Sequence, residues 1–284
     1  MLISPPFGGG RAPVLAKNAV ASSQPLATQA GIEALQNSGN AVDAALATAI
    51  TLTVVEPTMN GLGGDGFALI WDGKKLHGMN ASGRAPAAWT PEYFAGKAAM
   101  DLIGWNTVTV PGMVSGWIEL SRKFGKLPFA QLFKRAIDYA ENGFPVSPVI
   151  ARQWREAIPI LKNQPGFSDS FLIEGKSPTA GQIWRYPAQA KTLREIAETE
   201  GESFYTGKLA QSMVDFAQST GGCFTMADFA ANKTDWVEPL AFDYGEYTLH
   251  EIPPNGSGIV AQIALGILQA ANAKQYPANS AQRI

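Results

Sequence analysis

A single arginine stands in the segment Asn80-Ala81-Ser82-Gly83-Arg84-Ala85-Pro86, where a predicted strand runs into a turn. It is the first arginine after Arg11, and residues 18–73 hold five acidic side chains and neither lysine nor arginine. A planar guanidinium binds a carboxylate through two parallel hydrogen bonds. Arg84 is therefore a candidate for holding an anionic substrate. The alternative is an ordinary surface arginine at the end of a strand.

Residues 61–66 carry glycine in the Gly-x-Gly-x-x-Gly pattern of the dinucleotide-binding fingerprint. That fingerprint needs a strand before it and a helix after it, so that the helix N-terminus faces the pyrophosphate. The sequence predicts a helix before and a strand after, which argues against nucleotide binding. Two interpretations remain. The glycines occupy conformations closed to larger side chains where backbones pass closely, or Gly63, Gly64 and Asp65 form a loop that faces an active site.

Side chains that commonly act as nucleophiles or bases are scarce. His77 and His250 fall in predicted strands without metal-site spacing, and both are interpreted as structural residues. Cys223 is a candidate nucleophile, but a single cysteine is more often an inert small side chain. Neither a Gly-x-Ser-x-Gly nor a Ser-x-x-Lys pattern occurs. The residues alone predict no metal site and no complete catalytic apparatus.

The composition narrows the class of partner. The 284 residues include 46% hydrophobic and 16% charged residues, and the net charge is −2 at pH 7. A near-neutral chain lacks the positive field that holds a nucleic-acid backbone, so no nucleic-acid partner is expected. A charged fraction below the usual ~25% means either that this chain buries an unusual share of its surface or that a partner covers part of it. One cysteine, no signal-peptide pattern and no apolar run of ~20 residues predict a cytoplasmic protein without a membrane contact.

The first 80 residues predict the order helix, helix, strand, strand, which favours helices packed on an antiparallel sheet over a doubly wound fold. The second helix is apolar on nearly all sides and should lie between layers. Asn40 and Asp43 give it a capping-box start. The predicted bounds are 23–39 and 40–52 for the helices, and 67–71 and 75–80 for the strands.

Residues 111–235 are predicted to be mostly helical within a single domain that spans residues 1–284. Glycines are expected to end several of the helices. A strand is expected over residues 244–252 and a helix over residues 257–271. The helices predicted within the middle region are 111–125, 128–141, 149–162, 188–200 and 207–219, followed by a capped start at Thr225.

An ordered set of motifs over residues 12–272 resembles the large-subunit half of γ-glutamyltransferase-family proteins. The motifs that carry the resemblance are Ala21-Ser22-Ser23-Gln24-Pro25-Leu26-Ala27, Gly39-Asn40-Ala41-Val42-Asp43-Ala44-Ala45, Val55-Glu56-Pro57, Gly61-Leu62-Gly63-Gly64-Asp65-Gly66-Phe67, Val110-Pro111-Gly112, Gly125-Lys126-Leu127-Pro128-Phe129, Ala140-Glu141-Asn142-Gly143-Phe144-Pro145 and Pro253-Pro254-Asn255-Gly256-Ser257-Gly258.

The resemblance implies an N-terminal nucleophile hydrolase with an α+β fold, a four-layer αββα sandwich carrying a helical excursion. It implies a precursor that cuts itself and exposes a threonine at the start of a small subunit. That threonine attacks an amide carbonyl with its own amine as base, and no metal or organic cofactor takes part. The acyl group then passes to water or to an amine.

The family's Thr-Thr/Ser-His cleavage motif does not occur in these 284 residues, and the family continues beyond Arg283-Ile284. The chain is therefore expected to be the large subunit, with no catalytic nucleophile of its own and a small subunit from the same precursor as its partner. A dimer of such heterodimers is left open. A catalytically inactive binding or assembly subunit is the alternative outside enzymes.

Transferases of the family carry Arg-Glu-x-Ala-Pro, whose arginine holds a substrate carboxylate. Aligned on Ala85-Pro86, that position holds Ser82, and the arginine follows as Arg84. Two residues along a strand keep the same face and advance ~6.5–7 Å, so Arg84 is expected to hold the carboxylate and Ser82 to line the pocket. With residues 5–13, this favours the oxamate amidohydrolase branch and a small anionic amide substrate. A γ-glutamyltransferase, a glutathione hydrolase and a cephalosporin-type acylase are the alternatives.

Overall fold

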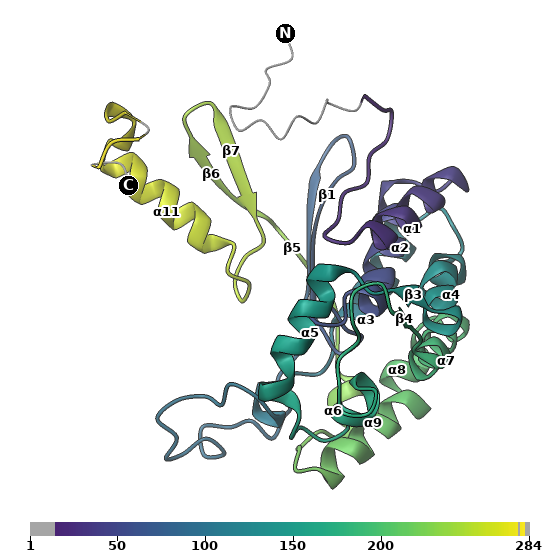
Figure 1. Ribbon diagram of the computed structural model, residues 1–284. Helices are drawn as coiled ribbons and strands as arrows, with labels where there is room; N and C mark the ends of the chain where they lie inside the picture. The colour runs from purple at the N-terminus through teal and green to yellow at the C-terminus, as the bar shows by residue number, and fades with distance from the viewer. Residues whose placement is uncertain (1–14, 278, 282–284) are drawn as a thin grey trace.

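The computed structural model describes residues 15–277 and 279–281. Its elements form a helical body, a three-stranded sheet beside it, and an outlying hairpin with its own helix (Figure 1). The N-terminal motif at residues 5–13 and the end at Arg283-Ile284 lie outside the described residues, so the expectations based on them stay predictions.

Two helices open the described chain where the sequence predicts them. α1 (Pro25–Gln36) and α2 (Ala41–Val55) pack against each other, and α2 also contacts the helices α3 and α4 described below. Leu46, Ile50 and Val54 of α2 are buried. A helix that is apolar all round gains stability on every side only when it is enclosed, and α2 is enclosed as expected.

Asp43 joins the start of α2 to a turn more than eighty residues away. Its carboxylate is fully buried and accepts N–H bonds from Asn40 at 2.8 Å, Lys126 at 3.1 Å and Leu127 at 3.3 Å. The Asn40 side chain in turn accepts the N–H groups of Val42 and Asp43, which completes the predicted capping box. A buried carboxylate is tolerated only where donors surround it, and these three backbone donors satisfy Asp43.

Residues 111–235 are mostly helical, as predicted. The predicted helix at 128–141 begins as a 3-10 turn, η2 (Phe129–Phe133), before α4 (Lys134–Asn142). The capping box predicted at Thr225 is present, because its side chain and that of Asp228 exchange hydrogen bonds with each other's backbone. No helix among the described residues is both long and apolar enough to cross a bilayer. The remaining elements of this region are α3 (Met113–Phe124), β3 (Phe144–Pro145), α5 (Pro148–Leu161), α6 (Phe167–Phe171), β4 (Ile183–Trp184), α7 (Pro187–Glu198), α8 (Glu202–Tyr205), α9 (Lys208–Ser219) and α10 (Met226–Ala230).

The sheet has the order β1-β2-β5, with β1 (Gly66–Trp71), β2 (Leu76–Ala81) and β5 (Asp235–Val237) all antiparallel. Gly66 pairs with Ala81, and Asn80 pairs with Asp235. The start of β1, the end of β2 and the start of β5 therefore meet at one end of the sheet. That shared end is where the side chains of the predicted site gather.

The two faces of this sheet differ. One face is covered by α3, and Met79 and Ala81 of β2 are buried there. The other face carries Phe67, Leu69 and Trp71 of β1, whose side chains are 40%, 41% and 65% exposed. Burying apolar area is a main source of stability, so this face is suited to being covered.

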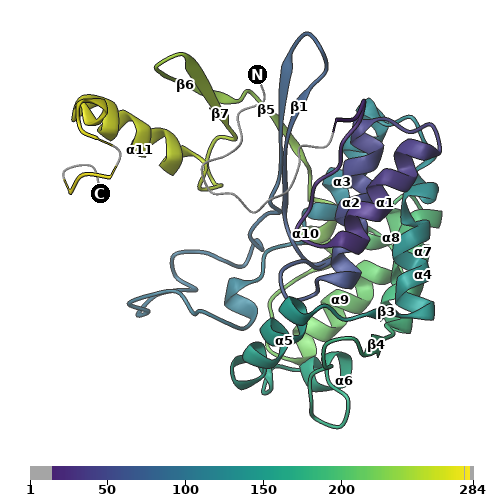
Figure 2. The same ribbon diagram turned by 45° about the horizontal axis from the view of Figure 1, so that its top comes forward.

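The strand predicted over residues 244–252 is confirmed at residues 247–251, but the strand that precedes it was not predicted. Two strands occupy this region, β6 (Leu240–Tyr244) and β7 (Tyr247–Glu251), and they turn at Gly245, whose φ is +68°. α11 (Ile259–Ala270) packs on this hairpin, and the Gln262 side chain donates to the carbonyls of Leu240 and Leu249 at 3.1 Å each. In Figures 1 and 2, α11, the hairpin, the sheet and the helical body follow one another across the molecule.

Candidate active site

A polar hollow opens at the shared end of the sheet. Its cavity volume is about 480 Å³. It brings together both residues that the sequence predicts to bind substrate, Ser82 and Arg84, with side chains from β5 and from the loop after β7. The residues that line it are Asn80, Ser82, Gly83, Arg84, Ala85, Lys233, Asp235 and Asn255.

Close backbone packing shapes the wall that carries Ser82 and Arg84. β2 ends at Ala81, and Gly83 has φ +79°. A Cβ at Gly83 would lie 1.8 Å from the Val110 carbonyl oxygen, and one at Gly112 would lie 2.2 Å from the Ala81 carbonyl oxygen. The strand alternation expected to place residues 82 and 84 on one face is therefore wrong, because a left-handed glycine separates them. Both residues nevertheless line the same hollow.

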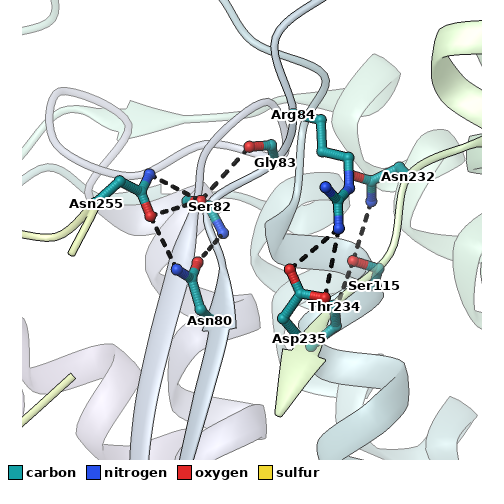
Figure 3. Close-up of polar contacts among 9 residues, drawn as sticks. All are labelled: Asn80, Ser82, Gly83, Arg84, Ser115, Asn232, Thr234, Asp235 and Asn255. Carbon is teal, nitrogen blue, oxygen red and sulfur yellow. Dashed lines mark hydrogen bonds and ion pairs between the residues drawn. The ribbon is translucent and has the colours of Figure 1, made fainter. Parts of the chain in front are cut away.

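The Ser82 side chain belongs to a small hydrogen-bonded group (Figure 3). Its hydroxyl accepts from Asn255 Nδ2 at 3.0 Å, and its N–H donates to Asn80 Oδ1 at 2.9 Å. Asn80 Nδ2 donates to Asn255 Oδ1 at 2.8 Å. These bonds connect the end of β2 to the loop between β7 and α11. One wall of the hollow is therefore formed by the end of β2 and another by that loop.

Arg84 pairs with an acidic neighbour across the hollow. Its Nη2 lies 3.1 Å from Asp235 Oδ2 and 3.4 Å from Oδ1, and both side chains are about half exposed. No hydrogen bond occupies Nε or Nη1 within the described part of the chain. The N–H groups of Nε and Nη1 therefore stay available to an incoming anion, on two different edges of the guanidinium.

Three lining residues lie outside the segment 80–86 and are not among the sequence candidates: Lys233, Asp235 and Asn255. Lys233 and Asp235 lie on a short segment that reads as an ordinary charged turn. Asn255 stands in the motif Pro253-Pro254-Asn255-Gly256-Ser257-Gly258, and that run of turn residues next to a predicted helix is the signal that could have identified it.

The wall behind the hollow rests on α3. Ser115 Oγ lies 2.8 Å from Thr234 Oγ1 and accepts from Asn232 Nδ2 at 3.2 Å, as Figure 3 shows. The Ser115 N–H donates to the Tyr205 hydroxyl at 2.9 Å, and that hydroxyl donates to the Pro111 carbonyl at 2.8 Å. Burial raises the pKa of Tyr205 to about 12, so its hydroxyl stays protonated and donates at neutral pH.

A second hollow of about 420 Å³ adjoins the first and shares Asn255 with it. Asp65 lines this second hollow with Phe67 and Glu251, whereas Gly63 and Gly64 line neither hollow. The expectation of unusual backbone angles is wrong, since no glycine of residues 61–66 has a positive φ, and a Cβ at Gly63 would meet open space. Close packing is present at Gly64, where a Cβ would lie 3.0 Å from Met113 Cε and 3.1 Å from the Gly61 carbonyl oxygen. Gly64 instead accepts the N–H groups of Gly112 and Met113, both at 3.1 Å.

The remaining sequence candidates lie outside both hollows. His77 Nε2 is 2.8 Å from Asp72 Oδ2 near the turn between β1 and β2. Cys223 is half-buried, and His250 lies on β7. The described residues contain no group of three or more His, Cys, Asp or Glu side chains arranged to hold a metal ion. What the first hollow offers chemically is a polar, net cationic site for a small anion.

This chain matches one protein family and several of its curated members. The family model described as Gamma-glutamyltranspeptidase matches residues 27–284. The glutathione hydrolase-like YwrD proenzyme of Bacillus subtilis is 39% identical over 89% of this chain and 49% of its own length. The oxamate amidohydrolase proenzyme of Klebsiella pneumoniae is 37% identical over 91% of this chain and 50% of its own length. The chain thus spans about half the length of these curated relatives.

Solved structures agree with this match. A cephalosporin acylase from Bacillus halodurans aligns with a TM-score of 0.85 at 42% identity, covering 98% of this chain and 55% of that one. A gamma-glutamyltranspeptidase from Pseudomonas nitroreducens aligns with a TM-score of 0.86 at 32% identity, covering 94% of this chain and 81% of that one. The mixed helix-and-sheet fold described above is thus a fold that these enzymes share.

Proposed function

Because the chain belongs to the gamma-glutamyltranspeptidase family, we propose that it is the large-subunit part of a self-cleaving amide hydrolase. Its substrate is a small anionic amide such as oxamate. The polar hollow around Arg84 is the observation that supports an anionic substrate, because its lining is polar and net cationic. The word proenzyme in the names of relatives at 39% and 37% identity supports a precursor that is processed.

In this proposal the nucleophile is a threonine on a second polypeptide from the same precursor. Its Oγ adds to the amide carbonyl, the C–N bond breaks, and the amine leaves with the proton that the threonine amine has taken up. Water then hydrolyses the ester. Arg84 holds the substrate carboxylate through N–H groups that its pair with Asp235 leaves free, and Ser82 lines the pocket. The loop at Gly63, Gly64 and Asp65 lies at the edge of the active site in this proposal, because Asp65 lines the adjoining second hollow.

The exposed sheet face supports a place for that second polypeptide. Phe67, Leu69 and Trp71 lie on the sheet face opposite α3, and α11 also has exposed apolar residues, among them Val260 and Ile263. We propose that strands of the second polypeptide fill the space between the sheet and the hairpin. They would complete a four-layer αββα sandwich in which α11 and the helical body form the outer layers.

A glutathione hydrolase is the second candidate. The observation that favours it is the 39% identity to a glutathione hydrolase-like proenzyme, beside the 37% identity to the oxamate amidohydrolase. A cephalosporin-type acylase is supported in the same way by the 42% identity to the cephalosporin acylase. An inactive binding subunit has no such support.

The test is to express the whole precursor and examine it in two stages. Mass spectrometry shows whether one polypeptide becomes two with a threonine at the new N-terminus. The processed protein is then assayed with oxamate, a γ-glutamyl anilide and a glutaryl amide at equal concentration. We expect cleavage and the highest kcat/KM with oxamate. A higher kcat/KM with either of the other amides would reject the oxamate assignment, and an unprocessed, inactive precursor would reject the enzyme.

A further inference from the structure

Lys233 is the unpaired cation of the polar hollow. It lines the hollow with Ser82, Arg84 and Asp235, and its side chain is exposed. Arg84 is already bonded to Asp235. No carboxylate among the described residues pairs with Lys233, and no hydrogen bond engages its ammonium group there. The net positive charge of the hollow therefore comes from Lys233.

The segment that carries Lys233 is held in a defined orientation. Asn232 and Thr234 both turn towards α3 and bond to Ser115 Oγ, at 3.2 and 2.8 Å. Side chains of an extended segment alternate between its two sides. Lys233 and Asp235 are consequently presented on the opposite side, where both line the hollow. Figure 3 shows the Asn232 and Thr234 bonds to Ser115 beside the Arg84–Asp235 pair.

We propose that Lys233 is a second substrate-binding cation and determines the charge that this hollow accepts. Asp235 neutralises part of Arg84, so two cations and one carboxylate leave room for one negative charge. A bound monoanion makes the hollow neutral, whereas a dianion leaves one charge uncompensated. The inference deepens the proposed function and depends on it, because it assigns substrate charge selection to Lys233 and Asp235.

Removing a surface lysine that does not bind substrate would affect anion affinity less than removing Lys233. Removal of an exposed lysine changes the affinity for a nearby anion little when the two are separated by solvent. A lysine that touches the bound carboxylate contributes a charge-assisted hydrogen bond, and its loss weakens binding by about 5- to 30-fold. The two cases are distinguished by comparing Lys233 with a lysine outside the hollow. Lys162, exposed at the end of α5, serves as that control.

The experiment measures anion binding without turnover. Pyruvate is a monoanion with the shape of oxamate, and oxalate is a dianion of similar size. Both are titrated by calorimetry into the processed, full-length enzyme at constant ionic strength. The variants are Lys233→Met, Asp235→Asn and the control Lys162→Met, and each is first checked for its melting temperature and its two chains.

We expect Lys233→Met to weaken the binding of pyruvate by about 5- to 30-fold and the binding of oxalate by more. Lys162→Met should change neither affinity. Asp235→Asn should shift the preference towards oxalate by about 3-fold or more, because it leaves a second uncompensated cation. Wild-type affinities in Lys233→Met, or a wild type that binds neither anion, would overturn the inference. Oxamate turnover is measured separately. Lys233-dependent binding without turnover rejects only the oxamate assignment, and turnover with unchanged binding in Lys233→Met rejects only the role of Lys233.

Discussion

At the scale of single residues, Arg84 carries the main functional prediction. Arg84→Ala should lower kcat/KM on the best anionic amide by about 10- to 100-fold, the effect of losing a charge-assisted hydrogen bond. Arg84→Lys should recover only part, because an ammonium lacks the planar fork. The free energy of unfolding should change by less than about 1 kcal/mol, since the pair with Asp235 is half exposed. Steady-state kinetics measures kcat/KM, and denaturant melts measure the free energy of unfolding. Wild-type kinetics in Arg84→Ala would show that the residue is structural.

Two glycines of the site region offer a matched comparison. Gly83 has φ +79° and no space for a Cβ, whereas Gly63 has open space around it. Gly83→Ala should lower the free energy of unfolding by about 3 kcal/mol or more, because strain and a backbone clash add together. Gly63→Ala should change it by less than about 0.5 kcal/mol. Urea titration of both variants measures the difference, and equal losses would contradict the packing described here.

The sequence predicts the site only where one segment carries it. Ser82 and Arg84 stand two residues apart in a recognisable segment, and both line the hollow. Lys233, Asp235 and Asn255 are common surface residue types that reach the hollow from other parts of the chain. The place of Lys233 and Asp235 depends on β2 pairing with β5, and that of Asn255 on its bonds to Asn80 and Ser82, and no local pattern specifies either. The glycines of residues 61–66 show the opposite error, since a conspicuous local pattern has no unusual backbone conformation.

At the scale of elements, the turn between β1 and β2 is held by one carboxylate. The pKa of Asp72 lies at about 2, below its ordinary value of 3.8, because the N–H of Lys75, the His77 side chain and the N–H of Lys74 bond to the charged form. A lowered carboxyl pKa stabilises the fold at pH values above 3.8, and that contribution is lost as the pH falls towards about 2.

Asp72→Asn should therefore lower the melting temperature at pH 6, and the gap from wild type should narrow as the pH falls from about 4 to about 2. The exposed Asp169→Asn in α6 is the control and should show no such pattern. Thermal melts across this pH range give the answer. A gap that stays constant with pH would mean that the charge of Asp72 does not hold the turn.

Helices and strands could be predicted where a short stretch of sequence determines them. The capping boxes at Asn40 and Thr225 and the apolar length of α2 are such stretches, and the structure has them. The sequence predicted one strand over residues 244–252, and the strand at 240–244 was missed, although Gly245 at the first position of the two-residue turn is a recognised hairpin signal. The packing of this hairpin on α11 through Gln262 is a tertiary contact without a local signal.

At the scale of the whole molecule, the apolar face of β1 makes a testable interface. Leu69→Asp should weaken association of the two processed chains by about 10-fold or more, because a charge is then buried against apolar partners. The control is Leu102→Asp, at a side chain that is 95% exposed and outside the sheet. Size-exclusion chromatography of the processed precursor over a dilution series measures the association. Dissociation only in Leu102→Asp would place the interface elsewhere.

The polar hollow also has a place in the order of biosynthesis. Arg84 and its partner Asp235 are 151 positions apart, and Ser82 and Asn255 are 173 apart. Contacts between residues so far apart in the sequence form late in folding, because the entropy of closing a long loop is lost before the contacts contribute stabilising free energy. A chain still emerging from the ribosome can therefore form α1 to α10 before the hollow is lined. The lining is complete only once Asn255 has been made, so the wall that Asn255 supplies is added last.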